Sequence, residues 1–246
     1  ALPGVTSFTD TGLTNGTTYS DVVEAVNEEL LTTQAAPVTA TPVAAPVTPP
    51  PAATMVDTFT RPDTTGTIGV ADTGQTWGTP NAAWGISGNQ LLAQTNAATV
   101  LCQTGQPSAS AQYDADVQHV STGGRFAGLV FAALGASSRW NLVIDARDNL
   151  ANLQRRSNDS SSSVVSVPMD IGTGVYHLRA RFNGPGNLIQ CWVWQGDGPP
   201  PTTPTITYTL PAADVTQFNA GGTRVGVTTT GTTAVRVDNV SVRALA

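Results

Sequence analysis

The sequence contains no lysine, and only 11% of its 246 residues are charged. All 11 of its basic residues are arginines, and the formal net charge is −6. An acidic chain without a basic cluster argues against nucleic-acid binding, because contacts with phosphates require clustered positive side chains. No apolar run approaches the roughly 18 residues of a membrane-spanning helix, so we also predict no membrane insertion.

Cysteine is scarce, since Cys102 and Cys191 are the only two. Two cysteines cannot form a disulfide framework or a zinc site, and the sequence contains no CxxC pair. Each cysteine lies in an apolar run, which favours buried free thiols. A single disulfide between them is the alternative.

Motifs for catalysis are also missing. Residues 54–246 contain no glutamate, whereas glycoside hydrolysis normally uses two carboxylates on either side of the scissile bond. The segment "YDADV" does place Asp114 and Asp116 on one face of a strand, but such a pair is more typical of a solvated polar face. No GxSxG, HExxH or P-loop motif is present. We therefore predict a protein that is not an enzyme.

The residues that are abundant favour strands and turns. Glycine occurs 24 times, β-branched residues recur, and turn-forming segments such as "NGPGN" and "QGDGPPP" are spaced along the chain. We divide the chain into residues 1–41, a Pro/Ala-rich linker at 42–53, and a long β-rich region at 54–246. The linker is expected to be extended and semi-rigid.

The first region resembles the C-terminal part of a fibronectin type III domain. In that family a leucine precedes a turn, a tyrosine opens a strand, and apolar residues follow at alternate positions. The residues that carry the resemblance are Leu13, the segment "NGTTY" at 15–19, Val23, Ala25 and Asn27. The resemblance implies a closing strand near residues 36–42. It covers less than half of such a domain, so we expect an upstream segment or another chain to complete the sandwich. A simple β-arm is the alternative.

The third region resembles a concanavalin A-like, laminin G-like jelly roll. The segments that carry the resemblance are "DTFTR" (57–61), "GQTWGTPNAAWGISGNQLLA" (74–93) and "RVGVTTTGTTAVRVDNVSVRAL" (224–245). It implies an all-β, antiparallel β-sandwich in which the first and last strands pair. The same arrangement is typical of minor tail proteins of actinobacterial phages and of secreted bacterial modules.

Alternation along two segments separates an apolar face from a polar one. In "RWNLVIDAR", Trp140 belongs to the apolar face, so we predict that it lies in the core. In "VYHLRARF", His177 and Arg179 lie opposite the apolar face. We interpret His177 as a surface or hydrogen-bonded histidine rather than a metal ligand, because His119 is the only other histidine.

The role of the two tryptophans in "NLIQCWVWQGD" depends on strand register. If Phe182 pairs with Ile189, then Trp192 and Trp194 lie on the outer face beside arginines. If Phe182 pairs with Leu188, both tryptophans enter the core, because a shift of one residue exchanges the two faces. The first register gives one consistently apolar face, and we prefer it. It allows arginine–tryptophan stacking.

An outer sheet face with aromatic and polar side chains can bind a sugar, since rings stack on C–H groups and polar groups bind hydroxyls. The alternative is a patch covered by a loop or another subunit. The candidate ligand-binding residues are Arg139, Asn141, Asp145, Arg179, Trp192 and Trp194.

We predict no cofactor, although calcium is a possibility that the jelly-roll resemblance raises. Calcium requires oxygen ligands, and Asp57, Asp238 and Asn239 approach one another if the terminal strands pair. Alternatively, the two aspartates cap turns or pair with an arginine such as Arg61. No metal ligand is assigned.

The resemblances lead to a functional expectation. We expect a non-enzymatic phage virion surface protein, a tail or fibre component, whose lectin-like jelly roll adheres to host-surface glycans. Its expected partners are other virion proteins, copies of itself and those glycans. The alternatives are a structural capsid or tail decoration protein without ligand, and the carbohydrate-binding module of a secreted bacterial glycosidase.

Overall fold

The structure is a computed structural model. It describes residues 9–26, 32–42, 53–78, 83–94, 99–102, 110–121, 124–158, 160–183, 186–212, 214–215, 224–231 and 234–245. The chain divides into two compact units, Ala1–Pro49 and Pro50–Ala246. Nearly all of the predicted linker lies outside the described residues.

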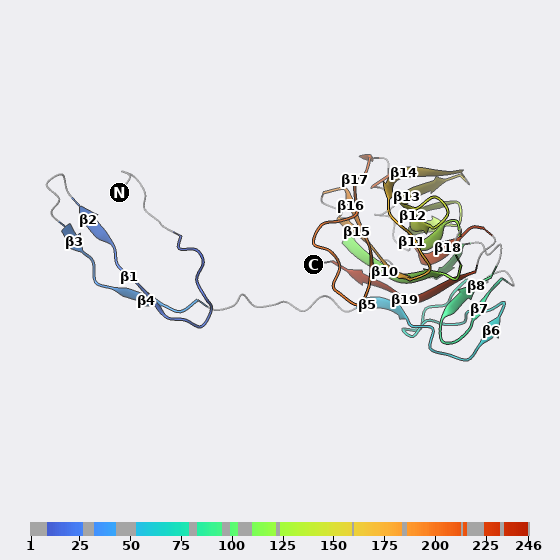
Figure 1. The fold of residues 1–246 in the computed structure, drawn as a ribbon, viewed down its shortest axis with the longest axis horizontal. Helices are drawn as coiled ribbons and strands as arrows, with labels where there is room; N and C mark the ends of the chain where they lie inside the picture. The colour runs from blue at the N-terminus through green and yellow to red at the C-terminus, as the bar shows by residue number, and fades with distance from the viewer. Residues whose placement is uncertain are drawn as a thin grey trace. The chain divides into compact units, whose positions relative to one another are not determined.

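The first unit is an antiparallel two-stranded ribbon (Figure 1). Strand β1 (Tyr19–Asp21) pairs with β4 (Val38–Ala40), and β2 (Glu24–Val26) pairs with β3 (Thr32–Gln34). Tyr19 opens a strand as predicted, and β4 lies within the expected closing segment. None of the ribbon residues whose burial is described is buried. The resemblance to a fibronectin type III domain remains a prediction, because the ribbon alone has no core that could establish it.

The second unit is a sandwich of two antiparallel sheets (Figure 1). The nine-stranded sheet has the order β17-β16-β15-β10-β19-β8-β7-β6, and β5 also pairs with β19. The six-stranded sheet has the order β14-β13-β12-β11-β18-β9. The predicted all-β jelly-roll fold is confirmed. No helix in the described part of the chain is long and apolar enough to cross a membrane.

The strands of each sheet have the following bounds. The nine-stranded sheet contains β5 (Ala53–Asp57), β6 (Thr64–Thr65), β7 (Trp84–Ile86), β8 (Leu91–Ala93), β10 (Ser110–His119), β15 (Val175–Asn183), β16 (Leu188–Gln195), β17 (Ile206–Thr209) and β19 (Val235–Ala244). The six-stranded sheet contains β9 (Val100–Cys102), β11 (Ala127–Gly135), β12 (Ser138–Asp145), β13 (Leu150–Ser157), β14 (Ser160–Pro168) and β18 (Arg224–Thr229).

One hydrophobic core fills the space between the two sheets. Tyr113 of the nine-stranded sheet packs against Phe131 of the six-stranded sheet, with ring centres 5.5 Å apart. Trp140 is fully buried, as predicted. Cys102 and Cys191 are both buried and free, so the prediction of free thiols is confirmed. Burial raises the pKa of the Cys191 thiol far above its usual range, which keeps this group protonated and unreactive.

The terminal strands β5 and β19 pair, as the jelly-roll resemblance implied. At the end of β5, the buried carboxylate of Asp57 accepts two hydrogen bonds from Arg61, at 2.7 and 3.0 Å. It also accepts hydrogen bonds from the Trp77 indole, at 2.6 Å, and from the backbone N–H of Phe59, at 2.8 Å. Of the alternatives for Asp57, the structure therefore shows pairing with Arg61 and capping of a turn.

The last residue of β10, His119, is fully buried. Burial lowers the pKa of His119 below its usual value of 6.5, although the nearby Asp145 carboxylate partly opposes this shift. The unfolded chain therefore takes up a proton at a higher pH than the folded chain does. We expect the free energy of unfolding to fall as the pH drops below about 6.5.

Chemical denaturation between about pH 7.5 and 5.5 measures this effect of His119. In the His119→Leu variant, which keeps an apolar side chain at the buried site, this part of the pH dependence should disappear. If the free energy of unfolding changed equally with pH in the two proteins over that range, the result would contradict a neutral, buried His119.

Candidate functional site

The hairpin of β15 and β16 has the predicted register. Phe182 pairs with Ile189, which directs the odd-numbered residues of β16 into the core. The inward side chains are Ile189, Cys191 and Val193, and all three are buried. Trp192 and Trp194 consequently lie on the outer face of the nine-stranded sheet, opposite Arg179 and His177.

Neither tryptophan presents an open aromatic platform. Trp192 is only 6% exposed, and the guanidinium of Arg181 lies over its ring, 5.2 Å from the centre. Trp194 is half-buried, with the guanidinium of Arg179 at 5.6 Å and the ring of His177 at 5.1 Å from its centre. The predicted arginine–tryptophan stacking is confirmed. The rings thus hold the arginine and histidine side chains in place on the outer face of the sheet.

Strand pairing arranges the outer face into three rows that run across β16, β15, β10 and β19. Each row takes one residue from each strand. Successive rows are two residues apart along β16, β15 and β10, whereas an irregularity in the pairing of β10 with β19 places the second-row and third-row residues of β19 three positions apart. The first row is Gln190, Arg181, Gln112 and Arg243; the second is Trp192, Arg179, Asp114 and Ser241; the third is Trp194, His177, Asp116 and Asp238.

Asp114 organises the second row and links it to the first. Its Oδ1 accepts a hydrogen bond from Nε of Arg179 at 2.6 Å, and its Oδ2 lies 3.6 Å from a terminal nitrogen of Arg243. The side-chain amide of Gln112 donates to Asp114 Oδ2 at 2.7 Å. Gln112 in turn accepts a hydrogen bond from Nε of Arg181 at 2.7 Å. These contacts fix the orientation of all three arginines.

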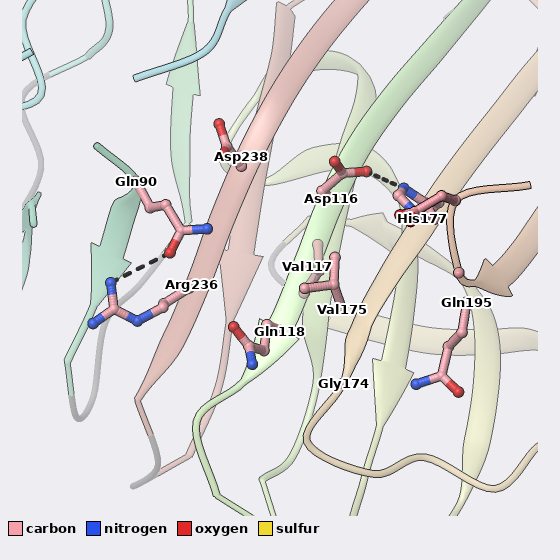
Figure 2. A pocket seen from close by; sticks show the side chains of 12 residues that line it. Gln90, Asp116, Val117, Gln118, Gly174, Val175, His177, Gln195, Arg236 and Asp238 are labelled. Carbon is pink, nitrogen blue, oxygen red and sulfur yellow. Dashed lines mark hydrogen bonds and ion pairs between the residues drawn. The ribbon is translucent and has the colours of Figure 1, made fainter. Parts of the chain in front are cut away.

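In the third row, Asp116 has two partners. His177 Nδ1 lies 2.5 Å from its Oδ1 (Figure 2). The side-chain amide of Asn239 donates to Oδ2 of Asp116 at 2.7 Å. Asp238 lies directly opposite Asp116 on β19. Burial, together with the negative charge of Asp116, raises the pKa of Asp238 above its usual value. The third row therefore contains two facing carboxylates, of which Asp238 keeps its proton more readily than an ordinary aspartate does.

A pocket of about 480 Å³ opens beside the third row (Figure 2). Carboxylates, side-chain amides, an imidazole and a guanidinium converge on it, in addition to backbone and two valines. Its lining residues are Gln90, Asp116, Val117, Gln118, Gly174, Val175, His177, Gln195, Gly196, Asp197, Arg236 and Asp238. Arg236 is held by the backbone carbonyl of Ser87 at 3.1 Å. This mixture of donors and acceptors suits a ligand that carries several hydroxyl groups.

Solved structures share this fold. The carbohydrate-binding module CBM66 of Bacillus subtilis matches with a TM-score of 0.53 and 16% identity, over 68% of this chain and 95% of that chain. The GH43 protein BlXynB of Bacillus licheniformis matches with a TM-score of 0.57 and 13% identity, over 77% of this chain but 39% of that one. A protein of Mycobacterium abscessus named for a β-glucanase matches with a TM-score of 0.51 and 11% identity, over 78% of this chain and 100% of that chain.

At these identities, the likeness establishes the β-sandwich fold alone. No family model matches the sequence, and a search of curated proteins finds no match.

The six predicted site residues do not form one site. Arg179, Trp192 and Trp194 lie together on the nine-stranded sheet, but Arg139, Asn141 and Asp145 belong to β12 of the six-stranded sheet. Within the six-stranded sheet, Nε of Arg139 donates to Asn141 Oδ1 at 3.1 Å. Asp145 Oδ1 caps a turn by accepting from the backbone N–H of Arg147 at 3.0 Å. Alternation identified the polar face of β12 but not the sheet to which it belongs.

Several residues that form the site were not among those predicted. Asp116 was interpreted as part of a solvated face, and His177 as a surface or hydrogen-bonded histidine. Gln112, Gln118 and Arg181 were not proposed as ligand-binding residues. The signal that marks them is the alternation in "QYDADVQH", where every second residue of β10 is polar. Strand pairing then adds the polar residues of β15 and β19.

The described residues contain no group of three or more histidine, cysteine, aspartate or glutamate side chains placed to hold a metal ion. Of the three residues considered for calcium, Asn239 binds Asp116 through its side chain and Asp238 through its backbone N–H, at 2.8 Å. Asp57 is satisfied by Arg61 and its other donors.

Proposed function

We propose that the jelly roll at residues 54–246 is a non-catalytic carbohydrate-binding module. Its ligand lies on the outer face of the nine-stranded sheet. The observation that carries this proposal is the pocket beside Asp116 and His177, where hydrogen-bonding groups from four strands converge next to the half-buried Trp194. Polar side chains held by other protein groups are suited to bind sugar hydroxyls without first having to be ordered.

The comparison with the B. subtilis carbohydrate-binding module supports the proposal. The match spans 95% of that module. The fold similarity shows that a domain of this size and architecture serves carbohydrate binding in another protein. Because a fold hosts many functions, the pocket itself remains the stronger support.

Glycoside hydrolysis is a second candidate, and one observation favours it. Asp238, with its raised pKa, faces Asp116 across β10 and β19, and glycoside hydrolysis normally uses two carboxyl groups, one of them as the acid. We propose binding instead, because both Asp116 oxygens are already engaged by protein donors. Release of reducing sugar by the intact protein that is abolished in Asp238→Asn would establish the enzymatic alternative.

For the biological setting, we propose surface display, in which the N-terminal ribbon and the Pro/Ala-rich segment precede the module in sequence. A tail or fibre component of a phage virion fits this organisation, and repeated copies on a virion increase avidity for weakly bound glycans. The match to part of a GH43 protein instead favours a module of a secreted glycosidase. Mass spectrometry of purified virions distinguishes the two settings, because only a virion protein is recovered with the particles.

A glycan array probed with the full chain tests the proposed binding. We expect selective, reproducible binding to one class of glycan, and loss of that binding in His177→Ala, which removes a pocket side chain but no core side chain. A native thermal unfolding curve for the variant serves as the control for folding. The absence of binding by the intact chain under multivalent presentation would overturn the proposal.

A further inference from the structure

The first row of the outer face carries positive charge that the protein does not neutralise. Arg181 forms no ion pair with any carboxylate in the described part of the chain; its Nε donates to the neutral side chain of Gln112. Gln112 pairs with Arg181 on one side and with Arg243 on the other, so the two arginines flank one glutamine. The carboxylate nearest to this row is Asp114, in the next row.

Arg179 and Arg243 therefore share Asp114, whereas Arg181 interacts with its charge without forming an ion pair. Arg179 takes its Oδ1 at 2.6 Å, and Arg243 is left at the longer distance of 3.6 Å from its Oδ2. Burial lowers the pKa of the Arg181 guanidinium, and the positive charges of Arg179 and Arg243 lower it further, while Asp114 opposes the shift. A partly buried cation among other cations is unfavourable, and a bound anion would relieve the repulsion.

Arg181 is also held in one place. Its guanidinium rests on the ring of Trp192, with 5.2 Å to the ring centre, and its Nε is fixed by Gln112. The two terminal amino groups remain for a ligand. A guanidinium fixed in this way can bind both oxygens of a carboxylate or sulfate, and it loses little conformational entropy on binding.

We propose that Arg181 and Arg243 bind the anionic substituent of an acidic glycan whose uncharged sugars occupy the pocket beside the third row. This inference rests on the proposed carbohydrate-binding function and adds the class of ligand. The first and third rows lie four residues apart along β10, β15 and β16, or about 14 Å, which requires an oligosaccharide rather than a single sugar. Carboxylate and sulfate groups share the chemistry that the two arginines recognise.

The first row is positively charged and the pocket at the third row is negatively charged, so an acidic glycan can bind in only one orientation. Asp116 and Asp238 line the pocket at the third row, and Asp197 lies at the same pocket. These carboxylates repel an anionic substituent from the pocket, while Arg181 and Arg243 attract it at the first row. A neutral glycan would gain no charge attraction from the first row.

Isothermal titration of the full chain with three oligosaccharide probes tests the inference. The probes are an uncharged galactan, an oligogalacturonate and a sulfated galactan of similar length. We expect one or both anionic probes to bind about tenfold more tightly than the uncharged one at low salt. The advantage should shrink as salt screens the charges. The tighter of the two anionic probes identifies carboxylate or sulfate as the preferred group.

Arg181→Gln should remove the advantage of the anionic probe and change the affinity for the uncharged probe much less. Arg181→Lys keeps the charge without the planar fork and should retain part of the advantage. Arg147→Gln, which changes an exposed arginine next to the six-stranded sheet, is the matched control and should change neither affinity. Thermal unfolding of each variant shows whether it is folded.

Two results would overturn the inference and leave the proposed function intact. One is equal affinity for charged and uncharged probes, and the other is binding of uncharged glycans on the array without binding of either anionic probe. A failure to bind any probe or any glycan on the array would overturn the inference together with the proposed function.

Discussion

Replacing Asp57 by alanine should lower the free energy of unfolding of the jelly roll by about 3 kcal/mol. The buried carboxylate receives hydrogen bonds from Arg61, from the Trp77 indole and from the backbone of Phe59. Its removal leaves the last two donors buried without a partner, which costs free energy. The expected value is at the lower end for a broken buried ion pair, because the side chain of Arg61 is 19% exposed and can turn toward water.

Asp72→Ala is the matched control for this prediction. Asp72 is the other carboxylate near Arg61, at 4.0 Å, but it is exposed and its loss should cost about 1 kcal/mol or less. Urea denaturation of the three proteins measures the difference. Equal destabilisation by the two substitutions would show that Asp57 does not anchor the first strand to the core.

Asp116→Ala should weaken glycan binding by roughly 10- to 100-fold, the loss expected when one or two hydrogen bonds to a charged group disappear. The carboxylate of Asp116 lines the pocket and also orients His177, at 2.5 Å, and Asn239, at 2.7 Å. Its removal deprives the ligand of an acceptor and lets both neighbours move. Isothermal titration with the glycan identified on the array measures the change.

The control for this substitution is Asp148→Ala, in the turn after β12 of the six-stranded sheet, where the carboxylate is exposed and pairs with Arg147 at 2.8 Å. It should leave the affinity unchanged. A folded Asp116→Ala protein with the affinity of the intact chain would place the ligand elsewhere on the molecule.

The register of one hairpin could be predicted because its two faces differ in chemistry. Only one pairing puts Ile189, Cys191 and Val193 on the same side as Phe182, and burying four apolar side chains decides the register. The core position of Trp140 followed from the same alternation. Local patterns of this kind are sufficient to predict which face of a strand is buried and which fold class the chain adopts.

The composition of the site could not be predicted from these patterns, because it depends on which strands are neighbours. Strands β10 and β15 are far apart in sequence, yet Asp114 faces Arg179 and Asp116 faces His177 across them. Strand β12 has a similar polar face, but it lies in the other sheet. A period of two residues shows that a side chain points outward but cannot show which sheet carries it.

The sequence predicted arginine–tryptophan stacking but could not show which arginine covers which ring. The pattern placed Trp192 on the outer face beside Arg179. The structure shows its ring covered by the guanidinium of Arg181 and only 6% exposed, so Trp192 offers no open surface to a sugar ring.

The chain's five tryptophans allow the central claim, glycan binding on the outer face of the nine-stranded sheet, to be tested in one measurement. The indole N–H of Trp194 donates to the backbone carbonyl of Gly198 at 3.2 Å beside the proposed site. The remaining reporters are Trp192 under Arg181 and the buried Trp77, Trp84 and Trp140. In an NMR titration with the bound glycan, each indole gives its own signal.

We expect the indole signal of Trp194 to shift in proportion to occupancy, together with a change at Trp192 when the glycan is acidic. The signals of Trp77, Trp84 and Trp140 should stay in place. An unchanged Trp194 signal at saturation, or shifts confined to the three buried indoles, would contradict binding on the outer face of the nine-stranded sheet.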